Sequence, residues 1–169
     1  MNTLIKFGTL AVTAAFLTAS IVPAEAGRVA ARNGKGSAAV AGSANGNVWA
    51  RGRAVTTSES DATTATSGGA FKAANGAWGA RASQTTVNPD GSATRRGGFA
   101  ASGARGSVAS EGSAARNADG TYSGSRATTA TNAATGNTYK GSTTYDSTNG
   151  VTRSATCTDA TGNTIACPR

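Results

Sequence analysis

Large aliphatic side chains are almost absent from this chain after residue 26. All three leucines, Leu4, Leu10 and Leu17, precede that point together with Met1, and Ile165 is the only isoleucine that follows it. Val, Ile, Leu and Phe together make up far less than the roughly 20% below which charged chains usually fail to fold around a core. The sequence therefore predicts a protein without an ordinary hydrophobic core.

The first 26 residues have the pattern of a bacterial secretory signal peptide. Lys6 supplies a positive charge, residues 7–22 are mostly apolar, Pro23 ends this stretch, and residues 24–26 match a small-x-small cleavage site. The stretch is shorter than the ~20 residues that a membrane span needs, and no second apolar run follows it. We expect an exported protein in the periplasm, at the cell surface or outside the cell, with no membrane span after cleavage.

The region after the expected cleavage site divides into two parts. Residues 27–42 are basic and show no periodicity, which predicts a flexible linker. From residue 43 to residue 169 the chain has a repeating pattern: Asp61, Asp90 and Asp119 are 29 residues apart, and Asn149 follows 30 residues later. A period of this length is typical of repeat architectures.

Each period contains two segments that resemble turns. Several have Asn, Asp or Ser first and Gly last, as a type I turn closed by a left-handed glycine prefers. The turn glycines that we single out are Gly76, Gly91, Gly120, Gly136, Gly150 and Gly162. A further turn is expected at residues 100–103.

The segments between these turns are rich in Thr, with scattered Val and aromatic residues, and this composition favours strands. The sequence predicts an all-β fold: an antiparallel meander of eight or nine short strands, two in each repeat of about 29 residues. This pattern is compatible with an open single-layer sheet, a closed sheet or a solenoid-like stack. The alternative is a largely disordered chain, because Gly and Ala weaken strands.

Aromatic residues often follow a turn glycine by two or three positions. In a regular repeat such positions would stack into one row, so we expect a row formed by Trp49, Trp78, Tyr122 and Tyr139.

The two cysteines, Cys157 and Cys167, lie five residues on either side of Gly162. An even number of cysteines in an exported chain indicates a disulfide. Two cysteines alone do not complete a zinc site, so we expect no metal. The sequence predicts a C-terminal hairpin that the disulfide closes.

Residues 145–164 contain Tyr145-Asp146, the turn glycines Gly150 and Gly162, and Asp159. This stretch resembles the YD repeats of Rhs-type bacterial surface and toxin proteins. The resemblance implies hairpin strands and a location outside the cytoplasm.

Catalytic patterns are missing from the sequence. The chain has no His, which removes the usual base of Ser and Cys triads. Most aspartates fall at expected turns, where an Asx role explains them. We expect no catalytic activity and no cofactor.

The net charge of +8 depends mainly on arginine, which is scattered through most of the expected strands. Arginine matches phosphate, carboxylate and sulfate groups, and neighbouring aromatic rings stack on sugars or bases. The candidate polyanion-binding residues are Arg51, Arg53, Arg81, Arg95, Arg96, Arg105 and Arg126.

Two functions fit this composition, and we expect the first, with the second as the alternative. The first is a low-complexity structural or adhesive protein of the cell surface or matrix, which associates with itself through strand edges. The second is a cationic module that binds lipopolysaccharide, an acidic polysaccharide or DNA. Salt separates them, because only polyanion binding weakens steeply with ionic strength.

Overall fold

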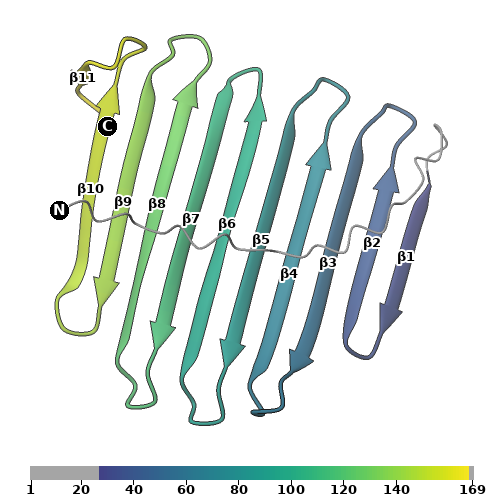
Figure 1. Ribbon diagram of the computed structural model, residues 1–169. Helices are drawn as coiled ribbons and strands as arrows, with labels where there is room; N and C mark the ends of the chain where they lie inside the picture. The colour runs from purple at the N-terminus through teal and green to yellow at the C-terminus, as the bar shows by residue number, and fades with distance from the viewer. Residues whose placement is uncertain (1–26, 168–169) are drawn as a thin grey trace, which may run out of the picture.

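The computed structural model describes residues 27–167, and these residues form one antiparallel sheet of eleven strands (Figure 1). The signal peptide expected over residues 1–26 lies outside the described residues. The strands are β1 (Arg28–Asn33), β2 (Gly36–Gly42), β3 (Val48–Thr57), β4 (Thr63–Lys72), β5 (Trp78–Val87), β6 (Ala93–Gly103), β7 (Gly106–Arg116), β8 (Tyr122–Asn132), β9 (Thr138–Asp146), β10 (Gly150–Thr158) and β11 (Thr164–Ile165).

Every strand pairs with the next one along the chain, so the order in the sheet is the order in the sequence. Strands β1 and β11 lie at opposite edges, and the sheet is open and one layer thick (Figure 1). The prediction of an all-β antiparallel meander is confirmed. The predicted number of eight or nine strands was too low, because two strands form where the sequence suggested a linker.

Residues 27–42 form β1 and β2 instead of a flexible linker. Strand β2 pairs with β3 from Gly36↔Ala54 to Gly42↔Val48, and β1 then pairs with β2. The reason is that a ladder needs only backbone N–H and C=O groups. The edge of β3 supplies these groups to a segment whose own side chains give no periodic signal.

The turn glycines lie where the chain reverses. All six that the sequence singles out have positive φ, between 70° and 91°. In the turn after β5, the N–H of Asn88 donates to the carbonyl of Ser92 and the N–H of Gly91 donates to the carbonyl of Asn88. This is the hairpin in which a type I turn is followed by a left-handed residue.

The turn expected at residues 100–103 is wrong. Strand β6 continues through these residues, and the chain reverses at Ala104 and Arg105. Gly103 pairs with Gly106 across this two-residue loop, and Gly106 takes a φ of 139°. A glycine at residue 106, and not at residue 103, therefore provides the unusual backbone conformation.

The two-strand repeat is visible in the turns. Those that contain Asp90, Asp119 and Asn149 all lie at one end of the strands, the lower end in Figure 1. The turn between β3 and β4 lies at the same end, but Asp61 occupies the place of the left-handed glycine there, with a φ of 60°. Asp61 is thus equivalent to Gly91, and not to Asp90.

The sheet has almost no buried side chains. Among the described residues only Ala39, Gly79, Ser110 and Cys157 are buried. The uninterrupted register of the ladders shows that these four residues share one face of the sheet. What core there is lies on this face alone.

Aromatic rings add to this limited burial by covering glycines of the same face. Phe71 lies over Gly79, its registered partner on β5, and Tyr145 lies over Gly124, its partner on β8. A glycine has no side chain above the sheet, and a ring from the neighbouring strand occupies the space that a side chain would take. The large side chains thus shield the backbone in a sheet that has no second layer.

Candidate polyanion-binding face

Nearly all strand arginines project from the face that holds the buried residues. Side chains alternate between the two faces along a strand, and residues directly opposite each other in a ladder share a face. The register therefore assigns nine arginines to this face, which we call the arginine face: Arg28, Arg32, Arg51, Arg53, Arg81, Arg95, Arg116, Arg126 and Arg153.

No strand residue of the arginine face in the described chain is acidic. The strand carboxylates of Glu111 and Asp146 both lie on the opposite face. That face is dominated by small side chains, and we call it the alanine face after its central row, Ala50, Ala70, Ala80, Ala100 and Ala109. The two faces therefore differ strongly in charge.

A shallow trough crosses the arginine face at right angles to the strands. Its floor is one register row of small residues on β4, β5, β6 and β7, namely Ser67, Ser83, Gly97 and Gly112. Arg53 on β3 and Arg126 on β8 continue the same row at its two ends. The floor is therefore bounded by a cation at each end.

The rows on either side of the floor carry larger side chains. Arg51, Arg81 and Phe99 stand on one side, and Arg95 and Tyr145 stand on the other. These residues line a groove of about 920 Å³. A second groove of about 360 Å³, with Tyr139 and Arg153 in its lining, shares Arg126 with the first. The two grooves therefore lie end to end between β3 and β10, with Arg126 between them, and together they form the trough.

Two of the arginines are held by contacts within this face. The guanidinium carbon of Arg126 lies 5.7 Å from the centroid of the Phe99 ring, and its Nε donates to Ser110 Oγ at 2.8 Å. The guanidinium of Arg51 lies 5.4 Å from the centroid of the Trp49 ring. Cation–π contacts orient a guanidinium and leave its charge unneutralised. Both arginines remain exposed and free to bind an anion.

The structure brings together five of the seven arginines that the sequence suggested. Arg51, Arg53, Arg81, Arg95 and Arg126 share the arginine face. Arg96 lies on the alanine face, and Arg105 lies in the turn between β6 and β7. Neighbours such as Arg95 and Arg96 necessarily point to opposite faces of a strand.

Sequence reasoning left four arginines of this face out of the candidate site. Arg28 and Arg32 belong to the segment interpreted as a linker, and Arg116 and Arg153 lie in expected strands. The even spacing of Arg28 and Arg32 within β1 is a signal, as for Arg51 and Arg53, whereas Arg116 and Arg153 are the only arginines of their strands. Only the register between strands shows which side each pair occupies.

The structure divides the four aromatic residues that the sequence placed in one row. Trp49 and Tyr139 lie in the same register row of the arginine face. Tyr122 is at the other end of β8 from that row, and Trp78 lies on the alanine face. The four residues follow their turn glycines by either two or three positions. Side chains alternate between the faces along a strand, so these two spacings point to opposite faces and could not define a single row.

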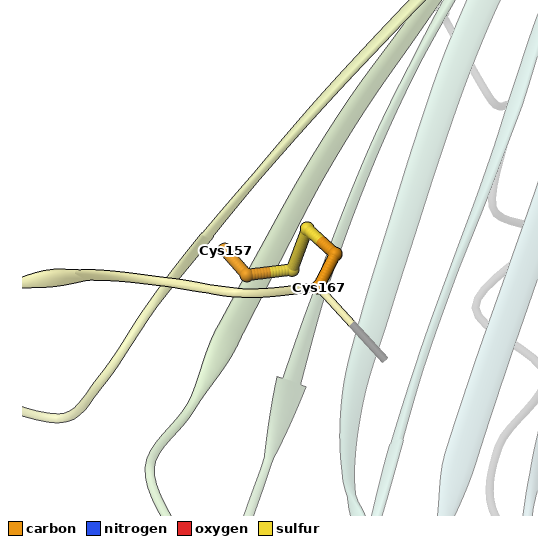
Figure 2. The surroundings of a disulfide bond; sticks show 2 residues. All are labelled: Cys157 and Cys167. Carbon is orange, nitrogen blue, oxygen red and sulfur yellow. A yellow bond between two sulfur atoms is a disulfide. The ribbon is translucent and has the colours of Figure 1, made fainter. Parts of the chain in front are cut away.

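The two cysteines form a disulfide at the C-terminal edge of the sheet (Figure 2). Cys157 lies on β10 and Cys167 follows β11, with their Cα atoms 5.2 Å apart. Strand β11 pairs with β10 only at Cys157 and Thr158. The disulfide therefore attaches a very short edge strand that two backbone pairs would hold weakly.

The turn aspartates have structural partners. Hydrogen bonds from the Thr121 hydroxyl and then from its N–H lower the pKa of Asp119 below the ordinary value. The Thr161 hydroxyl and the Asn163 N–H lower the pKa of Asp159 in the same way. The described residues contain no cluster of three or more Asp, Glu, Cys or His side chains that could hold a metal ion.

No helix within residues 27–167 is long and apolar enough to cross a membrane. Comparisons with protein-family models, with curated proteins and with solved structures find no match to this chain.

Proposed function

We propose that this protein binds anionic polymers through its arginine face. The observation that carries the proposal is the segregation of charge: nine strand arginines share one face of the described sheet, and the strand carboxylates lie on the other. Both faces of this sheet are largely exposed, so solubility alone gives no reason to place arginine on one of them. Concentrated on one face, the guanidinium groups create a positive field that attracts a polyanion.

The proposed role is binding without catalysis, and the proposed location is outside the cytoplasm. A disulfide-distance cysteine pair is compatible with an oxidising, exported compartment. Together with the signal peptide expected over residues 1–26, it supports an exported protein whose partners are polyanions of the cell envelope or its surroundings.

Two double variants with the same change in net charge test the proposal. Arg53→Ala/Arg81→Ala removes charge from the arginine face, and Arg96→Ala/Arg105→Ala removes it elsewhere. On immobilised heparin, the first variant should elute at lower salt than the wild type. The logarithm of its affinity should also fall less steeply with the logarithm of salt concentration, the slope changing by roughly one for each arginine removed.

The control variant should elute close to the wild type. Equal losses of affinity in both variants would show attraction by net charge alone and would contradict a binding face. Thermal melts of both proteins establish that the sheet is intact.

The structure also favours a second role, a structural one through self-association. Strand β11 covers only the last two residues of β10, so in the described chain the remainder of β10 has an open edge, as β1 has on the far side. Open edges are templates for pairing with another copy. Light scattering at low and high salt tests this role, because backbone pairing should persist at ionic strengths that release a polyanion.

A further inference from the structure

We infer that the ligand of the arginine face is a single-chain acidic polysaccharide that lies in the trough across the strands. This inference rests on the proposed function and narrows it to one class of polymer. It is carried by the direction of the trough, its width, the spacing of its arginines and the state of its aromatic rings.

The direction of the trough requires an extended ligand. The floor residues occupy one register row, so the trough runs from strand to strand and not along any one of them. From Arg53 on β3 to Arg153 on β10 it crosses seven strand intervals, roughly 34 Å at the usual strand spacing. A compact ion or small metabolite would use only a fraction of this length.

The width of the trough selects a single chain. Its walls stand two residues on either side of the floor, as Arg81 and Thr85 flank Ser83 along β5. Four residues of strand correspond to roughly 13 Å between the walls. One extended polymer chain fits between walls at this separation, and a nucleic-acid duplex is too wide to reach the floor.

The spacing of the arginines matches a sparse anion. The trough arginines are Arg51 and Arg53 on β3, Arg81 on β5, Arg95 on β6, Arg126 on β8 and Arg153 on β10. Apart from the pair on β3, neighbouring arginines are roughly 10–14 Å apart, because Arg81 and Arg95, on adjacent strands, stand on opposite walls. A polysaccharide with one acidic group in every second sugar has charges at comparably wide intervals. A nucleic acid carries a phosphate on every nucleotide, and many phosphates would lack a partner.

Two of the aromatic rings of the arginine face are not free stacking platforms for bases, because guanidinium groups already lie over Trp49 and Phe99. Non-specific binding of single-stranded nucleic acid depends on open aromatic faces as well as on charge. The floor instead offers hydroxyl groups, such as the paired Ser67 and Ser83, whose Oγ atoms are 3.0 Å apart. Hydroxyl groups of a sugar chain find hydrogen-bond partners there.

The test compares three probes at one salt concentration: hyaluronan, which has one carboxylate per disaccharide, poly-dT, and heparin as a general polyanion. Wild-type protein should bind hyaluronan at least tenfold more tightly than poly-dT. Ser83→Tyr fills the trough without changing charge and should weaken hyaluronan binding at least tenfold. Gln84→Tyr adds the same ring to the alanine face and should change binding less than twofold.

A series of hyaluronan oligosaccharides gives a readout that needs no variant. Affinity should rise with length until the oligosaccharide spans the trough, roughly 34 Å, and should then level off. Tighter binding of poly-dT than of hyaluronan, no effect of Ser83→Tyr, or no dependence on length would overturn the inference and leave the proposed function standing if heparin still binds. Failure of all three polymers to bind would overturn the proposed function itself.

Discussion

The ring of Phe71 on β4 lies so close to the backbone of Gly79 on β5 that no Cβ atom fits between them. Glycine in a strand ordinarily costs about 0.5–1 kcal/mol relative to alanine. Here the missing side chain has a structural use, because Gly79 makes room for a ring that covers the sheet. The pair shows how a single-layer sheet uses glycine to bury part of an aromatic side chain.

Gly79→Ala should therefore destabilise the protein by about 1–3 kcal/mol, as overpacking does. The matched control is Gly52→Ala on β3, where a Cβ would meet no atom closer than 3.7 Å. This substitution should stabilise the protein by about 0.5–1 kcal/mol through the unfolded state. Denaturant unfolding measures both.

The clash itself is tested by a double-mutant cycle. When Phe71→Ala is already present, Gly79→Ala should become neutral or stabilising, because the ring that it meets is gone. A loss of stability that is unchanged by Phe71→Ala would show that Gly79 is needed for another reason.

Asp61 is the one described non-glycine residue with positive φ. Its N–H donates to the carbonyl of Ser58, the same turn bond that Gly91 makes to Asn88. The left-handed conformation costs an L-residue about 1–2 kcal/mol, with Asp among the more tolerant types. Asp61→Gly should therefore raise the free energy of unfolding by up to about 1 kcal/mol. Gly91→Asp is the reverse experiment and should lower it, as measured in the same denaturant titration.

Local turn chemistry was predictable from the sequence, and the identity of the faces was not. Glycine after Asn, Asp or Ser marks a chain reversal because a left-handed residue is needed there. Arg95 and Arg96, in contrast, are indistinguishable by composition. Only pairing with Thr85 and Gln84 on β5 assigns the first to the arginine face and the second to the alanine face. Register is a tertiary property, and a shift of one residue would exchange them.

The same reasoning explains why β1 and β2 were missed. Their segment is short, rich in alanine and without alternation, so its propensity favours no structure. Strand formation there depends on the edge of β3, which supplies backbone partners from Gly36 to Gly42. Arg28 and Arg32 could be assigned to the arginine face only once this pairing was known.

The Cys157–Cys167 disulfide should stabilise the C-terminal edge. It closes a loop of 10 residues in sequence, for which the loss of unfolded-state entropy corresponds to roughly 2–3 kcal/mol. Cys157→Ser/Cys167→Ser should lower the melting temperature. Wild-type protein with reductant should melt at the same temperature as this variant. Reductant should leave the variant unchanged. Equal melting temperatures for the oxidised wild type and the variant would contradict a stabilising role.

Stability should fall as the solution is acidified. The pKa values of Asp90, Asp119, Asp146 and Asp159 are lowered by hydrogen bonds in their turns. Below the ordinary aspartate pKa of about 3.9, the unfolded chain takes up protons that the folded chain binds only at lower pH. The contribution of these carboxylates is therefore complete above that pKa and is lost as the pH falls through the lowered values.

Asp119→Asn/Asp159→Asn tests this source of pH dependence. The amide oxygen still accepts hydrogen bonds from the turn but does not titrate, so the variant should lose less stability than the wild type between pH 6 and pH 3. Thermal melts over this range measure the difference. A smaller loss should remain in the variant, because Asp90 and Asp146 still titrate and because acid raises the net positive charge and so the repulsion within the sheet. Identical pH profiles would show that Asp119 and Asp159 contribute nothing to the loss.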